Sequence, residues 1–428
     1  MDKASFKRAG WLAGTNIYEV NTRQYSTEGT LNAFAKELPR LKNMGVEVIW
    51  FMPVHPIGEK NRKGKLGSYY SIMDHKAINP EFGTLDDFKN VVEQAHAQGM
   101  KVIMDWVANH AAWDHVWTKD HPDYFERDAD GNFKPPYDWT DVIQIDHSNA
   151  AQQDAMIDAM KFWVSHFDID GFRADLAHLT PLDFWKKART QIEPLKADLF
   201  WLAETEETNY HEVFDASFTW EWMHSTEDYY KQKTGLDGLN NVLNKYNSIF
   251  PASAYRMYFT SNHDENTWNG TEYEKYGDMA KALAVFSFTW NGIPMIYSGQ
   301  ELPNLKRLEF FEKDVIDWNG EYALHEFYKT LLDLKKRNPA LRAADPAVST
   351  FKISTSEDNS ILAYIRKNKN DEVLVFLNLS GEKTGVEIND ENISGPYTNV
   401  FNKTENDLTA NRFFEMQPWE FLVFEKLN

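Results

Sequence analysis

The stretch TLDDFKNVVEQAHAQGMKVIMD, residues 84–105, combines a helix, the signals at both of its ends and the strand that follows it. Thr84 and Asp87 form the capping box that is typical of a helix start. Four apolar residues then recur at helical spacing, namely Phe88, Val91, Val92 and Ala95. Gly99 marks the helix end, and the run 101–105 predicts a strand. A helix followed at once by an apolar strand is typical of a parallel sheet.

The same alternation of strands and helices continues on both sides of this unit. Upstream, a strand is predicted at 17–20, a helix from Leu31 to Leu41 with Gly45 as its stop, and a strand at 46–52. Downstream, the predicted helices are 152–166, 181–190 and 279–289, and the predicted strands are 169–175, 200–204, 213–218, 257–261 and 294–298. Eight strands that alternate with helices predict an α/β fold, a closed (β/α)8 TIM barrel over residues 1–343.

Two regions depart from the alternation. After His110 the chain becomes aromatic and rich in Asp and Pro, which predicts a short loop excursion after the third strand at about 110–148. From about Ala344 the apolar pattern becomes strand-like, as in 361–365 and 373–377, with turn-rich spacers between. Residues 344–428 are therefore predicted to form a C-terminal antiparallel β-sandwich domain.

Composition excludes several classes of partner. The chain has 45 basic and 65 acidic residues, a net charge of −20 that repels nucleic acid and anionic membranes. No apolar run is long enough for a membrane span, and the lack of cysteine excludes disulfides and thiolate chemistry. Residues 1–14 contain no signal-peptide core, so we expect a cytoplasmic protein, or a periplasmic or secreted one if a leader was removed.

Polar side chains gather where four predicted strands end. The segments are DWVANH (105–110), GFRAD (171–175), LAE (202–204) and SNHD (261–264). A single Asp at a strand end is usually a cap or a turn residue. Because the carboxyl ends of all barrel strands share one mouth, four such segments together indicate an active site.

Three carboxyl groups in this mouth suggest a division of labour. Asp175, Glu204 and Asp264 would repel one another unless one is protonated or a cation offsets the charge, and Arg173 can supply that cation. This favours an ionised Asp175 as nucleophile and a Glu204 with raised pKa as proton donor, which is what glycoside hydrolysis requires. The chain has 15 Trp, 19 Tyr and 28 Phe. Their flat rings fit the apolar faces of sugar rings as well as they fit an aromatic-rich core.

A specific resemblance covers nearly the whole chain. KVIMDWVANH, DGFRADLAHL, FWLAETEE and FTSNHDENTW, in this order, resemble the four signature regions of the α-amylase family, glycoside hydrolase family 13. The resemblance extends to IYEVNTRQY, GSYYSIMDHKAINPEFGT, IDHSN and the C-terminal β-domain.

The resemblance implies a role for each matching residue. Asp175 would form a covalent β-glucosyl ester, Glu204 would act as acid and then base, and Asp264 would stabilise the transition state. The substrate-binding residues would be Arg173, which orients the nucleophile, His110 and His263, which bind the reacting sugar, and Tyr70, which stacks under its ring. The chemistry would require no cofactor.

Some positions depart from the family pattern. Tyr70 is followed by Ser71 where many members have an Asp that supports the arginine, so Arg173 is expected to be held differently. The run 176–179 after the nucleophile also differs, which leaves the contacts to the leaving part of the substrate open. Many members bind a structural Ca²⁺ through the Asn that matches Asn109, whereas the cluster 128–132 fits an Asp-Gly turn better than a calcium loop, so calcium stays open.

Three functions therefore compete. The first is a retaining hydrolase of α-glucosidic bonds, α-1,4 bonds in starch-type glucans or maltooligosaccharides above all. The second is an α-glucanotransferase or glucosyl isomerase with the same catalytic acids, and the third is a non-catalytic glucan-binding protein. The third is disfavoured because clustered carboxyl groups are costly without a catalytic role. Oligomeric state is not encoded in these patterns, and a monomer is the simpler expectation.

Overall fold

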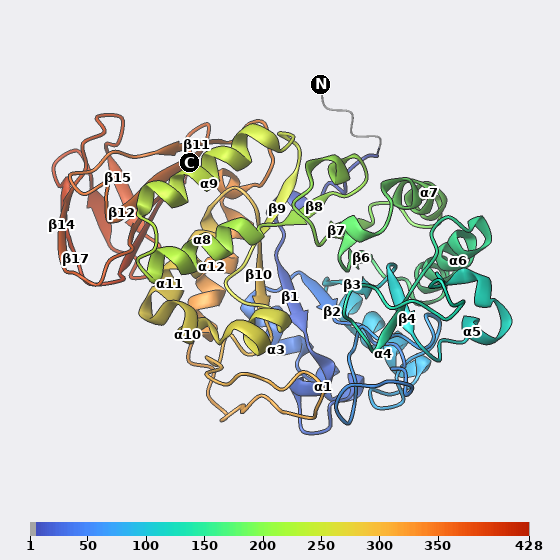
Figure 1. Cartoon of the computed structure of the whole chain (residues 1–428). Coiled ribbons are helices and arrows are strands. Elements are labelled where there is room, and N and C mark those ends of the chain that lie inside the picture. Colours follow the sequence, from blue (N-terminus) through green and yellow to red (C-terminus); the bar gives the residue numbers. More distant parts are fainter. Residues whose placement is uncertain (1–5, 428) are drawn as a thin grey trace.

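The computed structural model describes residues 6–427 and shows a barrel joined to a C-terminal β-domain (Figure 1). Eight parallel strands close in the order β1-β10-β9-β8-β7-β6-β3-β2, which confirms the predicted barrel. The strands are β1 (Ile17–Val20), β2 (Val48–Phe51), β3 (Lys101–Trp106), β6 (Gly171–Ala174), β7 (Phe200–Ala203), β8 (Ala216–Phe218), β9 (Tyr255–Tyr258) and β10 (Ile293–Tyr297).

Helices surround the strands. The longer ones are α3 (Leu38–Met44), α4 (Leu85–Ala97), α6 (Ala150–Phe167), α7 (Leu182–Ile192), α8 (Trp220–Tyr230), α9 (Leu236–Ile249), α11 (Ala280–Thr289) and α12 (His325–Arg337). The short ones are α1 (Thr22–Tyr25), α2 (Leu31–Ala35), α5 (Trp117–Asp120) and α10 (Glu272–Tyr276). The capping box of α4 is present, since the Asp87 amide donates to Thr84 Oγ1 and the Thr84 amide donates to Asp87 Oδ2.

One predicted helix is wrong in its extent. The apolar spacing from Leu31 to Leu41 predicts a single helix, whereas the structure has α2 and α3 with a break between them. Pro39 has no amide hydrogen to donate to the carbonyl of Ala35, four residues earlier, and it stands in the first turn of α3, where proline is tolerated. The apolar stripe therefore continues across two helices, and Gly45 ends the second one in a left-handed conformation.

Barrel strands divide their side chains between two apolar clusters. In β7, Phe200 and Leu202 point into the barrel centre, whereas Trp201 and Ala203 join the layer between the strands and the helices. This is the period-two alternation of a strand, and both faces are covered as in other parallel sheets. The barrel centre is therefore a packed core rather than a channel.

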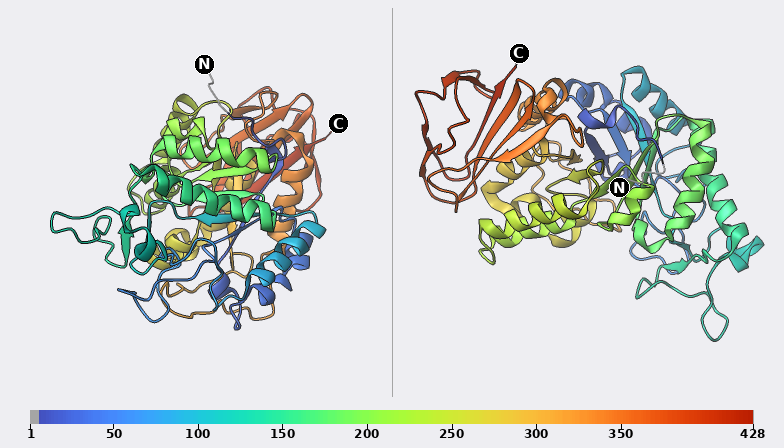
Figure 2. Two further views of the ribbon diagram at one scale, coloured as in Figure 1. Left: turned by 90° about the vertical axis from the view of Figure 1, so that its right-hand side faces the viewer. Right: turned by 90° about the horizontal axis from the view of Figure 1, so that it is seen from above.

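The excursion after β3 is a small hairpin unit that projects beside the barrel (Figure 2). Strands β4 (His110–Ala112) and β5 (Val142–Gln144) pair antiparallel, with α5 and η2 (Pro122–Tyr124) between them. At its tip the Asp128 amide donates to the Asn132 carbonyl at 2.9 Å, and Gly131 has φ +82°. The expected Asp-Gly turn is confirmed.

The C-terminal domain consists of two antiparallel sheets that pack face to face. The six-stranded sheet has the order β11-β12-β13-β18-β15-β16, and β14 pairs with β17 in the second sheet. The strands are β11 (Ser349–Lys352), β12 (Ile361–Asn368), β13 (Asp371–Asn378), β14 (Thr384–Glu387), β15 (Pro396–Asn399), β16 (Glu405–Asp407), β17 (Phe413–Met416) and β18 (Phe421–Lys426). Side chains of both sheets, including Phe376, Val386 and Met416, share one buried cluster, as expected of a sandwich.

Within residues 6–427 the structure has no helix that is both long and apolar enough to cross a lipid bilayer.

Gly171 controls the spacing of two central barrel strands. It faces Phe200 in the β6–β7 pair, and a Cβ atom added to it would lie 2.0 Å from the Phe200 carbonyl oxygen. We expect Gly171→Ala to lower the free energy of unfolding by about 3 kcal/mol, because a backbone atom cannot move aside as a side chain can. Denaturant unfolding measures the effect. Gly14→Ala is the control, since a Cβ atom there meets nothing within 4 Å, and an equal loss in both variants would contradict the explanation.

Candidate active site

Two carboxyl groups lie at the same level of the barrel mouth because the strand ladder continues past the strand ends. The Asp175 amide donates to the Trp106 carbonyl at 2.9 Å, and the Glu204 amide donates to the Ala174 carbonyl at 3.0 Å. Asp175 directly follows β6 and Glu204 directly follows β7. Both side chains therefore reach the same place from neighbouring strands.

The mouth contains a cavity of about 300 Å³. Its lining residues are Ser68, Tyr70, His110, Trp139, Asp141, Val142, Asp175, Leu176, Glu204, His263 and Asp264. Six of the seven catalytic and substrate-binding residues that the sequence predicts are in this lining. The seventh, Arg173, lies fully buried beneath the cavity, and Asn109 is not part of the lining.

Arg173 links the acidic groups of the site. Its Nη1 atom is 2.9 Å from an oxygen of Asp105 and 2.9 Å from an oxygen of Asp175, and its Nη2 atom is 2.8 Å from Glu204 Oε2. Both predicted catalytic carboxylates thus contact one planar cation. Their separation is therefore limited to about the width of a guanidinium group plus two short contacts.

Asp105 is a site residue to which sequence reasoning assigns no role, although it begins the segment 105–110. It supplies a carboxylate 2.9 Å from Arg173 Nη1, and the expectation that Arg173 is held differently from the family pattern stays a prediction. The Tyr70 hydroxyl, at 2.9 Å, and Trp50 Nε1, at 3.2 Å, both donate to Asp105 Oδ2. An acidic residue between two apolar neighbours, Met104 and Trp106, inside the strand 101–106 is the signal that could have revealed it.

Burial shifts the protonation of the two central acids. Burial raises the pKa of Asp175 to about 7, with Arg173 opposing the shift and Asp105 and Asp264 adding to it. Burial likewise raises the pKa of Glu204 to about 7, again against Arg173. The raised pKa of Glu204 agrees with its predicted role as proton donor. The raised pKa of Asp175 favours its protonated form, so the ionised nucleophile that the sequence predicts depends on the opposing charge of Arg173.

His263 is the second residue that connects acidic side chains of the site, and its ring contacts Glu19 and Asp264. His263 Nδ1 lies 2.5 Å from Glu19 Oε1, and Nε2 lies 2.8 Å from the Tyr70 hydroxyl and 3.3 Å from Asp264 Oδ2. Burial lowers the pKa of His263, but the charges of Asp264 and Glu19 outweigh it and raise the pKa well above its usual value. Burial raises the pKa of Asp264, but the charge and hydrogen bond of His263 outweigh burial. The net pKa of Asp264 is therefore lowered, and the carboxylate stays ionised.

The remaining lining shapes the wall of the cavity. Burial lowers the pKa of His110 to about 4, so its ring is neutral, and the ring packs against the edge of Trp139 at 5.6 Å between centroids. Leu176 has φ +38°, an uncommon value for leucine, and this conformation directs its amide to Glu204 Oε2 at 2.8 Å. His110 is one of the predicted residues, whereas no sequence signal predicts the contribution of Leu176. The Tyr70 ring stacks on His263, and its stacking on a sugar stays a prediction.

The surroundings of Asn109 do not fit a calcium ligand. The side-chain amide of Gln144 donates to the Asn109 carbonyl at 2.9 Å, to Asn109 Oδ1 at 3.0 Å and to the Ile145 carbonyl at 3.3 Å. After the nucleophile, the carbonyl of His178 accepts a hydrogen bond from Tyr210. The part of the chain that is described holds no group of three His, Asp or Glu side chains suited to a metal ion. Asn109 Oδ1 and these carbonyl oxygens thus each accept a hydrogen bond from a protein donor.

Comparison with known proteins agrees with this geometry. Residues 13–144 and 137–316 match the family model for the α-amylase catalytic domain, and residues 351–423 match that for the maltogenic amylase C-terminal domain. The crystal structure of a noncanonic maltogenic α-amylase, AmyB from Thermotoga neapolitana, is 30% identical with a TM-score of 0.90, and the match covers 97% of this chain and 99% of that one.

Two curated relatives match over most of this chain. The α-amylase MalA of Haloarcula japonica is 27% identical over 395 residues, which are 88% of this chain and 57% of the relative. An α-1,4-glucan:maltose-1-phosphate maltosyltransferase of Rhodospirillum rubrum is 27% identical over 412 residues, which are 87% of this chain and 57% of the relative. The chain thus spans little more than half the length of these two relatives.

Glu19 offers a test of the His263 network. In Glu19→Gln the imidazolium loses a buried anionic partner, which is worth about 1.5–3 kcal/mol, so we expect the pKa of His263 to fall and kcat/KM to drop about 10- to 100-fold. The imidazole titration followed by NMR distinguishes this effect from a loss of folding. Glu372→Gln, at a buried carboxylate of the C-terminal domain, is the matched control. An unchanged His263 titration in Glu19→Gln would contradict the role of Glu19.

Proposed function

The chain belongs to the α-amylase family, glycoside hydrolase family 13, and we propose that it cleaves α-glucosidic bonds in starch-type glucans or maltooligosaccharides with retention of the anomeric configuration. The observation that carries this proposal is the contact of Asp175 and Glu204 with the single buried guanidinium of Arg173. Retaining glycosidases need two carboxyl groups only about 5–5.5 Å apart, and a shared cation favours such a close pair. The bond favoured by the family resemblance is α-1,4.

In the first step Asp175 attacks the anomeric carbon. The bond from this carbon to the leaving oxygen breaks as the new carbon–oxygen bond to Asp175 forms, and Glu204 gives its proton to the leaving oxygen. Arg173 holds both groups, and the Leu176 amide fixes one oxygen of Glu204. The product is a β-glucosyl ester of Asp175, a free sugar hydroxyl and an ionised Glu204.

In the second step Glu204 takes a proton from water, and the resulting hydroxyl attacks the same carbon. The ester bond breaks, Asp175 is released as carboxylate, and two inversions leave the original anomer. In the transition state of each step the reacting carbon carries partial positive charge. The ionised Asp264, backed by the charged His263 and Glu19, lies on the cavity wall, where a fixed negative charge stabilises that transition state.

Transfer to a sugar is the second candidate function, because curated relatives of similar identity are named maltosyltransferases. The two functions share the first step and differ in whether water or a sugar hydroxyl attacks the ester. Incubation with maltotriose separates them. Excess release of reducing ends supports the hydrolase, whereas formation of longer oligosaccharides without net release supports the transferase. The proposed site is complete within one chain, so we propose that the protein acts as a monomer.

We further propose that the Gln144 amide takes the place of a structural calcium ion beside Asn109. A chelator should then leave the unfolding temperature unchanged. Gln144→Glu should replace the donating amide with a carboxylate next to the Asn109 and Ile145 oxygens, so that added Ca²⁺ raises the unfolding temperature of this variant only. Differential scanning calorimetry with chelator or Ca²⁺ measures both effects. A chelator-induced fall in the unfolding temperature of the unaltered chain would overturn the proposal.

The catalytic assignment predicts different losses for two substrates. Asp175→Asn should abolish turnover of both an oligosaccharide and α-glucosyl fluoride. Glu204→Gln should slow oligosaccharide cleavage about 10²- to 10⁴-fold, the usual contribution of a general acid, but should leave the first burst of fluoride release nearly unchanged, because fluoride needs no proton to leave. Stopped-flow fluoride detection and thermal unfolding measure activity and folding separately. Equal losses on both substrates would contradict the assignment of Glu204.

The same assignment fixes the direction of the pH dependence. Glu204 must be protonated in the free enzyme, and burial raises its pKa to about 7, so kcat/KM for an oligosaccharide should fall as the pH rises through this value. For α-glucosyl fluoride this alkaline fall should be absent.

A further inference from the structure

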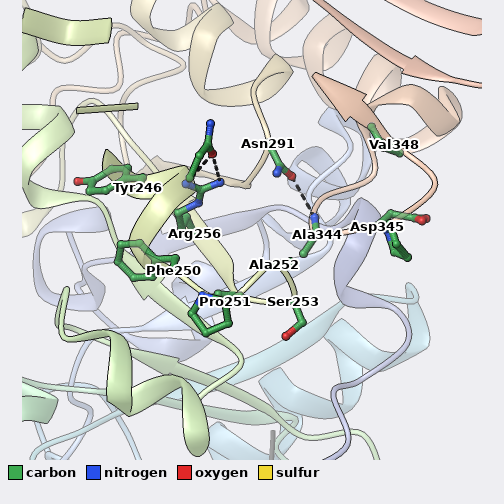
Figure 3. Close-up of a pocket in the computed structure, with 13 residues that line it drawn as sticks. Tyr246, Phe250, Pro251, Ala252, Ser253, Arg256, Asn291, Ala344, Asp345 and Val348 are labelled. Atoms are coloured by element: carbon green, nitrogen blue, oxygen red, sulfur yellow. Dashed lines mark hydrogen bonds between the residues drawn. The ribbon is translucent and has the colours of Figure 1, made fainter. Parts of the chain in front are cut away.

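A second hollow lies at the opposite end of the barrel from the active site. It has a volume of about 440 Å³ and lies between the end of α9, the start of β9 and the segment 344–348 that leads into the C-terminal domain (Figure 3). Arg256 near the start of β9, Asn291 just before β10, Asn247 of α9 and Asp345 are among its lining residues. The hollow therefore opens where the barrel and the C-terminal domain meet.

Arg256 forms the wall of this hollow without an anionic partner. Only 5% of its surface is exposed, and its Nη1 and Nη2 atoms lie 3.3 Å and 3.2 Å from Asn247 Oδ1, an uncharged oxygen (Figure 3). Its Nε atom is buried with no hydrogen-bond partner, and no carboxylate of residues 6–427 forms a salt bridge with it. Burying a guanidinium without a counter-charge is costly, so such a group indicates an anion that the chain itself does not provide.

Two more buried cations lie behind Arg256. Arg366 of β12 is fully buried and donates one hydrogen bond, to the Arg342 carbonyl at 2.8 Å, while its Nε and Nη1 atoms have no partner among the described residues. Lys335 of α12 donates to the carbonyls of Gly292, at 2.8 Å, and Leu341, at 2.6 Å. Neither cation forms a salt bridge with a carboxylate of the described chain.

Two of the three basic side chains have pKa values that a basic neighbour lowers. Burial, and after it the charge of Arg256, lowers the pKa of Arg366 against the opposing effect of Tyr364, to about 10. Burial and the charge of Arg366 lower the pKa of Lys335 well below its usual value. Asp345 at the hollow does not compensate them, because its carboxylate pairs with Arg342 at 2.8 Å. A chain of net charge −20 has thus gathered unpaired positive charge at one internal place.

We propose that this hollow binds a phosphate group, with Arg256 as its anchor. Phosphate would supply the negative charge that Arg256 lacks in this hollow, and a guanidinium binds phosphate oxygens through two parallel hydrogen bonds. Asn291 accepts from the Ala344 amide through Oδ1, so its amide nitrogen is the atom left for a ligand. The volume exceeds that of a single phosphate ion, so the group can come from inorganic phosphate or from a small phosphate monoester.

The position of the hollow defines the expected effect of the ligand. It adjoins α9, the start of β9 and the segment 344–348, so a bound phosphate would connect the barrel to the entry of the C-terminal domain. The carboxylates of the active site lie at the other ends of the same strands. The ligand should therefore stabilise the fold without entering the catalytic reaction.

Binding of inorganic phosphate and of glycerol 2-phosphate to the full chain at low ionic strength tests the proposal. Isothermal titration calorimetry should show saturable one-to-one binding of at least one probe, and the unfolding temperature should rise with its concentration. The probe that binds more tightly identifies the source, free phosphate or an ester. The absence of saturable binding for both probes would overturn the proposal.

Variants locate the site. Arg256→Gln should weaken binding at least about tenfold, equivalent to about 1.4 kcal/mol. Asn291→Asp, which keeps the oxygen that accepts from Ala344 but places a negative charge at the hollow, should do the same if Arg256→Gln fails to fold. Arg127→Gln, at an exposed arginine of the excursion, is the matched control and should bind as the unaltered chain does. Unchanged affinity in the folded Arg256 or Asn291 variant would also overturn the proposal.

Discussion

The catalytic mouth depends on one buried cation. Arg173 is completely removed from solvent, and its guanidinium contacts Asp105, Asp175 and Glu204. A cation in such a place is tolerated only when surrounding acceptors replace its lost hydration, and three carboxylates on three neighbouring strands do so. Each carboxylate likewise needs the cation, because burial drives each toward its neutral form. The charge state of the site therefore depends on the register of β3, β6 and β7. Gly171 preserves the spacing of β6 and β7, because a Cβ atom there would collide with the Phe200 carbonyl.

Most of the barrel could be predicted from local patterns, and the exceptions have physical causes. Capping residues and apolar periodicity identified all eight strands, because a strand buried on both faces reads as a short apolar run between helices. The break between α2 and α3 was missed because the apolar spacing passes over Pro39 unchanged, and only the missing amide hydrogen interrupts the helix.

For the site, sequence motifs at strand ends, together with Arg173 inside β6, were informative, whereas two acidic residues inside strands were not singled out. Six of the predicted residues line one cavity with Arg173 beneath them, whereas Asp105 and Glu19 act from within β3 and β1. Their partners come from other strands, so neither contact follows from spacing along the chain. The left-handed conformation of Leu176 is set by the surrounding fold and has no signature in the sequence. The same holds for Arg256, Arg366 and Lys335, which come from a barrel strand, a sandwich strand and a helix.

The hairpin at the tip of the excursion is held by local contacts and not by the salt bridges of the barrel mouth. Its turn is held by bonds within 128–132 and by Arg127 over the Phe133 ring, so its conformation owes little to the barrel beneath it. The base of the same excursion supplies Trp139, Asp141 and Val142 to the cavity wall. Residues can therefore be added or lost at the tip during evolution without a penalty in barrel stability, while changes nearer the base remodel the entrance. Changes at the base can therefore reshape the entrance while Asp175 and Glu204, which directly follow barrel strands, keep their positions.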